Sequence, residues 1–164
     1  MIEVVIDSIR ISLVSQHRIV MLKDVDSEKQ LAIWIGPCEA EAITIELQNT
    51  EVARPLTHDL LKNSIEELGG TISHILVNDL RDQVFYATLF VDVDGDVKEI
   101  DCRPSDSIAL AVRANVPIFI EEHVMEEAGI LPEEDLQEEV DEEDESLDAF
   151  SDFVDTLDFD DLDE

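Results

Sequence analysis

The end of the sequence limits where a folded core can form. Residues 132–164 contain 18 acidic residues and no lysine or arginine. So many like charges repel one another, and the stretch EEDLQEEVDEEDE has too few apolar side chains to pack. We therefore expect one folded domain over residues 1–131, an acidic flexible linker over residues 132–145 and an acidic tail over residues 146–164.

The tail has a pattern of its own in the stretch SLDAFSDFVDTLDF. Its apolar residues, from Leu147 to Leu157, recur at helical spacing with acids between them, and Ser146 is suited to cap a helix. This pattern predicts a short amphipathic helix over residues 146–159, whose apolar face could bind a protein partner. The alternative is a wholly disordered tail that only increases solubility.

The domain itself is acidic even without the tail. Residues 1–131 hold the other 24 of the chain's 42 acids against all 10 lysines and arginines, a net charge of −14. Such a surface repels nucleic-acid phosphate over most of its area. A nucleic-acid site would therefore need local positive charge or a metal ion.

Other features of the composition concern the protein's location. Two cysteines, Cys38 and Cys102, are too few for a disulfide framework. No apolar run reaches the roughly 18 residues that cross a bilayer, and the N-terminus MIEVVIDSIR lacks the basic start of a signal peptide. These features predict a cytoplasmic protein with reduced cysteines and no membrane association.

Apolar runs, turns and helical patterns alternate along the domain. The interleaving predicts an α+β fold, a largely antiparallel mixed sheet packed with about four helices, rather than regular βαβ winding. A change of phase near Asp7-Ser8 predicts a β-bulge in the first strand. This bulge would place six apolar residues on the core side: Ile2, Val4, Ile6, Ile9, Ile11 and Leu13. Strands are expected over residues 2–14, 19–22, 31–35, 71–80, 84–93, 97–102 and 116–120, and helices over residues 38–49, 57–68, 105–112 and 121–128.

Several apolar residues are assigned to the interior by this pattern. Trp34 is expected in the core or in a dimer interface, and both cysteines are expected to be small core residues. The helix over residues 57–68 is expected to bury Leu61, Ile65 and Leu68.

Two of the expected helices begin in the same way, in RPLTHDLL (residues 54–61) and DCRPSDSIAL (residues 101–110). Each has an Arg-Pro pair, a hydroxyl residue, an Asp and then an apolar run. Thr57 and Ser105 are expected to cap these helices, whose N-termini attract anions. Arg54 and Arg103 add planar cations suited to phosphate. The alternative is that both motifs only start and stabilise helices.

Further polar residues near these motifs could carry chemistry. His58 could transfer a proton near neutral pH. Asp59, Asp79 and Asp106 could hold Mg²⁺ or Mn²⁺, which prefer carboxylate oxygens and could activate water. Alternatively, the two helix-starting aspartates only interact with the helix dipoles, and His58 is exposed. Spacing along the chain does not show whether these residues meet.

Four segments, LAIWIGPCEAEAI, RPLTHDLL, NDLRDQVFYATL and DCRPSDSIALAVRANVPIFI, resemble the bifunctional nuclease domain family when taken in this order. The resemblance covers about residues 1–131, and DAFSDFVDTLDFDDL resembles a C-terminal segment of some bacterial members. It implies an α+β fold, a homodimer, and nuclease activity with DNA and RNA as substrates.

The resemblance supports a metal-assisted phosphodiesterase as the leading hypothesis. Its catalytic residues would be His58, Asp59 and Asp106, with Asp79 joining the two aspartates around Mg²⁺ or Mn²⁺. The alternative is a non-enzymatic module that binds an anion or a protein in the same polar pocket. A further hypothesis is that the acidic tail mimics nucleic acid and occupies the site. The residues expected to bind phosphate or substrate are Arg54, Thr57, Arg103 and Ser105.

Overall fold

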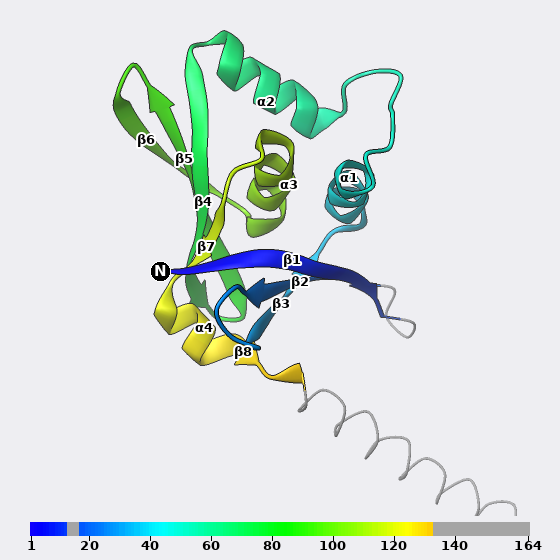
Figure 1. Ribbon diagram of the computed structural model, residues 1–164, viewed down its shortest axis with the longest axis vertical. Helices are drawn as coiled ribbons and strands as arrows, with labels where there is room; N and C mark the ends of the chain where they lie inside the picture. The colour runs from blue at the N-terminus through cyan, green and yellow to red at the C-terminus, as the bar shows by residue number, and fades with distance from the viewer. Residues whose placement is uncertain (13–16, 133–164) are drawn as a thin grey trace, which may run out of the picture. The chain divides into compact units, whose positions relative to one another are not determined.

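An eight-stranded sheet, mixed but mostly antiparallel, is the central element of the fold (Figure 1). The computed structural model describes residues 1–12 and 17–132, so the linker and the tail helix expected over residues 146–159 lie outside the described residues. The strand order is β6-β5-β4-β7-β1-β2-β3-β8, and only the β4–β7 pair among the described strand pairings is parallel. The expected α+β class is confirmed. The strands are β1 (Ile2–Ile11), β2 (Arg18–Asp24), β3 (Gln30–Ile35), β4 (Gly70–Arg81), β5 (Val84–Val93), β6 (Asp96–Cys102), β7 (Ile118–Ile120) and β8 (Gly129–Ile130).

The bulge expected in the first strand is confirmed. The β1–β2 register shifts between Ile6 and Ser8. An extra residue in a strand moves the side chains that follow it to the opposite face from the one that strict alternation predicts. Consequently both Ile6 and Ile9 pack against the core, although Ile11 is exposed. Leu13 lies outside the described residues.

Four helices accompany the sheet, and α3 is the most buried of them. Ile108, Ala109, Leu110 and Ala111 are almost inaccessible to solvent. Helix α3 contacts α1, α2, β4 and β5, as Figure 1 shows. Burial of a side chain such as Ile108 stabilises the fold by about 1.5–3 kcal/mol, and this packing fixes the start of α3 against its two neighbouring helices. The helices are α1 (Pro37–Leu47), α2 (Thr57–Glu67), α3 (Pro104–Ala114) and α4 (Glu122–Ala128).

Some residues assigned to the interior are exposed instead. Trp34 is not in the core: it is 60% exposed because it lies on the opposite face of β3 from the buried Ile33 and Ile35. Its alternative placement in a dimer interface stays a prediction. Cys38 is exposed in the first turn of α1. Leu61 and Leu68 are also exposed, and the residue that α2 buries is His58. None of the helices in the described ranges is both long and apolar enough to span a membrane.

Candidate functional site

The first turns of α1, α2 and α3 border one pocket with a volume of about 640 Å³. Because α3 packs against both other helices, residues from both Arg-Pro motifs reach the same cavity. The two helix starts, whose meeting the sequence left open, therefore border the same pocket in the structure. The pocket is lined by Cys38, Glu39, Glu41, Ala42, Ile45, Pro55, Leu56, Thr57, His58, Arg103 and Asp106.

The helices begin at different residues from those expected. Leu56 and Arg103 are the N-cap residues, so the expected capping roles of Thr57 and Ser105 are wrong. Proline forces the residue before it into an extended conformation and itself fits the first helical position. Arg103 accordingly has φ −75° and ψ 143°, and the helix starts at Pro104. Thr57 is likewise already the first helical residue of α2.

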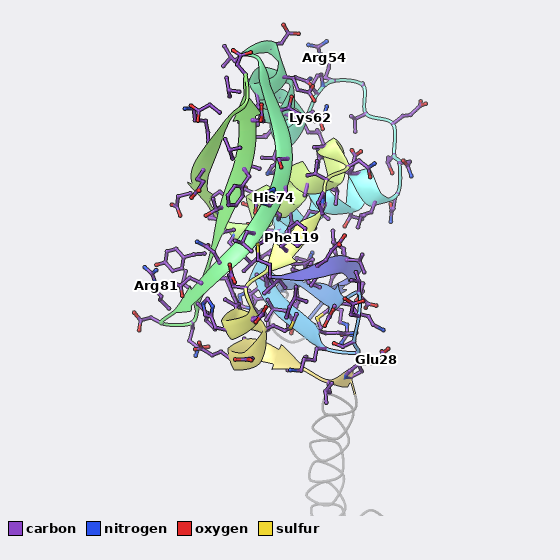
Figure 2. The ribbon with its side chains drawn as sticks, turned by 60° about the vertical axis from the view of Figure 1, so that its left-hand side comes forward. Glu28, Arg54, Lys62, His74, Arg81 and Phe119 are labelled. Carbon is purple, nitrogen blue, oxygen red and sulfur yellow. The ribbon has the colours of Figure 1, made fainter. Side chains whose placement is uncertain are left out.

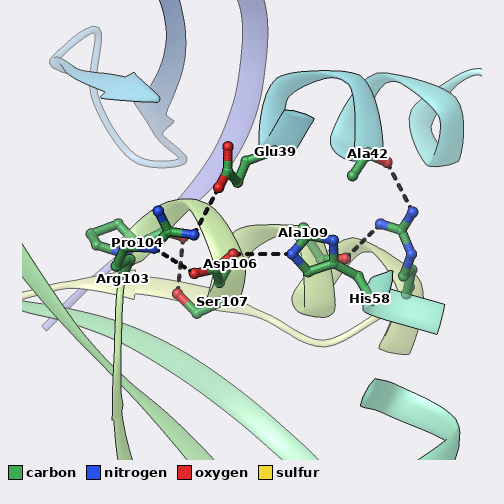
Figure 3. A network of polar contacts seen from close by, with 9 residues as sticks. Glu39, Ala42, His58, Arg103, Pro104, Asp106, Ser107 and Ala109 are labelled. Carbon is green, nitrogen blue, oxygen red and sulfur yellow. Dashed lines mark hydrogen bonds and ion pairs between the residues drawn. The ribbon is translucent and has the colours of Figure 1, made fainter. Parts of the chain in front are cut away.

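His58 and Asp106 join the two motifs directly. The Nε2 atom of His58 lies 3.1 Å from the Oδ1 atom of Asp106, between residues 48 positions apart (Figure 3). Burial alone would raise the pKa of Asp106, but hydrogen bonds from Arg103 and His58 outweigh it and hold that pKa below its usual value. Asp106 is thus a carboxylate, and in the tautomer of His58 that donates to it from Nε2, the lone pair of the ring is on Nδ1.

Arg103 is held between two carboxylates. Its Nε atom donates to Asp106 at 2.7 Å and its Nη2 atom donates to Glu39 at 2.7 Å. These two contacts, with Asp106 first, raise the pKa of Arg103. The cation is therefore balanced by acids of the protein, and Glu41 adds a further negative charge to the lining.

Arg113 connects the three helices from inside. Its side chain is 3% exposed and donates to Asp59 at 2.5 Å. It also donates to the carbonyl oxygens of Ala109 and Ala42, at 2.8 Å and 3.0 Å. Burial opposes ionisation of Asp59, but hydrogen bonds from the Leu56 N–H group and from Arg113 lower its pKa overall. Asp59 thus links α2 to α3.

The remaining expected site residues lie away from this pocket. Arg54 is exposed in the segment before α2 and does not line the pocket (Figure 2). Ser105 lines a neighbouring pocket. Asp79 forms an ion pair with Arg81 and lies 3.7 Å from the Nε2 atom of His123.

The three aspartates expected to share a metal ion have separate partners. Asp106 accepts from His58 and Arg103, Asp59 from Leu56 and Arg113, and Asp79 from Leu80 and Arg81. Among residues 1–12 and 17–132, no group of three or more His, Cys, Asp or Glu side chains is arranged to hold a metal ion. The described conformation therefore offers no prearranged metal site, and the requirement for Mg²⁺ or Mn²⁺ stays a prediction.

Two residues of the site, Glu39 and Arg113, were missed from sequence. Arg113 did carry a signal, because it is the single basic residue in the otherwise apolar helix segment SIALAVRA, and a buried cation needs partners. Glu39 had only a weak one, since an acid in a first helical turn is ordinary.

Comparisons with known proteins place these features in context. The chain matches the bifunctional nuclease domain family over residues 20–133. An uncharacterised protein of Mycobacterium tuberculosis is 38% identical over 163 residues, covering 98% of this chain and 97% of its own length. "Bifunctional nuclease 2" of Oryza sativa is 30% identical over 118 residues, which are 70% of this chain and 36% of the rice protein. "Bifunctional nuclease 1" of Arabidopsis thaliana is 28% identical over 87 residues, 51% of this chain and 27% of the plant protein.

Proposed function

The chain belongs to the bifunctional nuclease domain family, and we propose on this premise that it hydrolyses phosphodiester bonds in DNA and RNA. The observation that carries the proposal is the 3.1 Å contact between His58 and Asp106 at the edge of the shared pocket. A histidine oriented by a carboxylate is a common arrangement for proton transfer. The nuclease names of the plant relatives support the same activity, although they rest on partial alignments.

In the proposed reaction, a water molecule attacks the phosphorus atom of a bound phosphodiester. Nδ1 of His58 takes a proton from the water while Asp106 holds the Nε2–H group and stabilises the imidazolium that forms. A P–O bond forms to the water oxygen, the P–O bond to the leaving oxygen breaks, and the leaving oxygen receives a proton from solvent or from His58. Arg103 holds Asp106 in place through its Nε atom.

The test is cleavage of labelled single-stranded DNA and RNA by the wild type and by the variants Asp106→Asn and Asp101→Asn. Asp101 is exposed on β6 and does not line the pocket, so its variant makes the same chemical change outside the site. We expect Asp106→Asn to lose about 10²- to 10⁴-fold in rate, the usual contribution of acid–base catalysis, and Asp101→Asn to retain the rate. Each protein is assayed with Mg²⁺, with Mn²⁺ and with EDTA.

The outcomes separate the nuclease from a contaminating activity. A loss confined to Asp106→Asn, with unchanged circular dichroism, supports the assignment, and loss in EDTA supports the metal requirement. Equal cleavage by all three proteins, or cleavage by none, contradicts the assignment.

A second candidate function is a binding module without catalysis. The observation that favours it is the neutralised Arg103, because a cation already paired with Glu39 and Asp106 is poorly available to a scissile phosphate. In this case the polar contacts serve to hold the three helices together, and a ligand or protein binds without being cleaved. Binding of labelled oligonucleotide without any cleavage by the wild type would favour this module.

A further inference from the structure

A large aromatic side chain is exposed on β3 beside a second pocket. Trp34 is the only tryptophan of the chain, and its side chain is largely open to solvent between the buried Ile33 and Ile35. The ring of His17 contacts it edge-on, with 5.5 Å between ring centroids. An indole has two broad faces, so the contact with His17 leaves aromatic surface available for stacking.

The pocket next to Trp34 differs in charge from the rest of this acidic protein. It has a volume of about 250 Å³ and lies between β3, the β4–β5 turn and the start of α3. Among the described residues that line it, Arg103 is charged and none is acidic. Its volume is below the roughly 300–1,000 Å³ of pockets for drug-sized ligands, which favours a single small planar group. The lining therefore adds no negative charge of its own to a chain of net charge −32, although Arg103 is paired with Glu39 and Asp106.

The hydroxyl group of Ser105 lines this pocket and is available to a ligand. Ser105 is 7% exposed and lines the pocket, yet its Oγ atom has no hydrogen-bond partner among residues 1–12 and 17–132. The buried side-chain oxygen without a partner among the described residues is Oδ1 of Asn78, so the Oγ atom of Ser105 is reached by solvent and is accessible to a ligand in the pocket. Gln83, in the β4–β5 turn, adds an amide that can both donate and accept.

We propose that this pocket binds one unpaired base of single-stranded DNA or RNA. Trp34 stacks on the base, and Ser105 and Gln83 form hydrogen bonds with its edge. Stacking on an aromatic side chain tolerates any base, since every base has a π face. Arg103 lines both this pocket and the pocket of His58, so a strand held here lies next to the proposed catalytic pair. The inference rests on the proposed function, because the bound strand is the proposed substrate.

Intrinsic fluorescence tests the inference at a single site, because all tryptophan emission of the full chain comes from Trp34. The probes are short phosphorothioate-linked oligo(dT), which resists cleavage, and a duplex of the same length. We expect the single strand to quench the emission in a saturable manner and the duplex to leave it nearly unchanged. Equal responses to both probes, or no response to either, would overturn the proposal.

Variants provide a second measurement by anisotropy of a labelled oligo(dT). Trp34→Leu should weaken binding by roughly 5- to 100-fold, the range expected for loss of one base–aromatic stack. Tyr86→Leu removes another exposed aromatic side chain, which does not line the pocket, and should leave affinity unchanged. Ser105→Ala should weaken binding without lowering the unfolding temperature, since its hydroxyl has no partner to lose in the protein. Equal affinity of the wild type and Trp34→Leu would contradict the proposal.

The results also separate this inference from the proposed function. One outcome is that the single strand quenches the emission of the wild type and binds more weakly to Trp34→Leu, while the wild type cleaves no substrate. That combination would support the base pocket and reject the nuclease. Cleavage that Asp106→Asn abolishes, with unchanged binding by Trp34→Leu, would support the nuclease and reject the pocket. A third outcome is that tryptophan emission changes with protein concentration but not with added oligonucleotide, and that Trp34→Leu differs from the wild type in oligomeric state. This outcome would assign Trp34 to an interface between copies of the chain and overturn the proposal.

Discussion

Glu39 determines how much positive charge Arg103 can offer to a ligand. Its carboxylate binds the Nη2 atom of Arg103, while Asp106 binds the Nε atom, so the cation faces two anions. Arg103 is the only Lys or Arg among the described residues lining either pocket of the site. A phosphate bound in either pocket would therefore have to compete with Glu39 and Asp106 for this cation.

We predict that Glu39→Gln strengthens binding of single-stranded oligonucleotide. The change frees part of Arg103 for phosphate, and one further phosphate contact corresponds to roughly a 3- to 10-fold gain at low salt and to a steeper salt dependence by about one unit of slope. The measurement is anisotropy over a range of salt concentrations.

Glu41→Gln is the matched control for this prediction. Glu41 lines the same pocket but does not contact Arg103 in the part of the chain that the structure describes. Glu41→Gln removes the same charge without releasing Arg103, so its gain in oligonucleotide affinity should be smaller than that of Glu39→Gln. Equal gains for the two variants would mean that general charge, and not release of Arg103, controls binding.

At the scale of the helices, Arg113 and Asp59 keep the walls of the pocket together. Arg113 lies in α3, reaches Asp59 in α2 and donates to the carbonyl oxygen of Ala42 in α1. Breaking a buried ion pair by removing one partner leaves the other charge uncompensated, which is costly. The geometry of the His58–Asp106 contact therefore depends on an ion pair whose two residues do not line the pocket.

We predict that Arg113→Met lowers the free energy of unfolding by about 3–5 kcal/mol. Methionine retains an apolar stem of similar length but leaves Asp59 and two carbonyl oxygens without their donor. Urea denaturation measures the loss, and the double variant Arg113→Met/Asp59→Asn should recover part of it. If the double variant is less stable than Arg113→Met, the unpaired carboxylate of Asp59 is not the cause of the lost stability.

The same ion pairs predict how stability depends on acidity. The pKa values of Asp59 and Asp106 are lower in the folded state than their ordinary value near 3.8. Their contribution is therefore fully present above that ordinary value and is lost as the pH falls through the lower, folded-state values. We expect the free energy of unfolding to fall as pH decreases from about 5 toward 2, and to fall less steeply in Arg113→Met/Asp59→Asn. If the free energy of unfolding falls equally steeply with decreasing pH in the wild type and in the double variant, Asp59 is not a source of this pH dependence.

Local patterns predicted the elements better than the contacts between them. The bulge near Asp7-Ser8 was predictable because the alternation of apolar residues changes phase there, within a single strand. The exposure of Trp34 was not, since alternation defines two faces but not which face is covered. The ion pair of Asp79 with Arg81 was not predictable for a similar reason: it depends on where β4 ends in the fold. The contact of His58 with Asp106 depends on long-range packing of two helices, which spacing along the chain does not encode.

For the molecule as a whole, charge is distributed very unevenly along the sequence. Residues 132–164 carry 18 negative charges, more than the net −14 of residues 1–131. A nucleic-acid substrate of the proposed kind would be repelled by the net charge of residues 1–131, and at low ionic strength that repulsion extends beyond ~10 Å. The tail's negative charge is expected to oppose binding wherever its residues lie near the site.

We predict that deletion of residues 132–164 strengthens oligonucleotide binding by roughly tenfold at low salt, because association rates of charged partners respond strongly to net charge. The gain should disappear at high salt, where surface charges are screened. A chain of full length in which the tail acids are replaced by Asn and Gln should show the same gain, whereas a chain with its tail phenylalanines replaced by Ser should not. If the deletion and the Phe→Ser chain both strengthen binding, also at high salt, while the Asn/Gln chain does not, the tail opposes binding through its apolar residues and not through its charge. If none of the three changes alters binding, the acidic tail has no part in recognition of nucleic acid, and its charge acts elsewhere in the life of the protein.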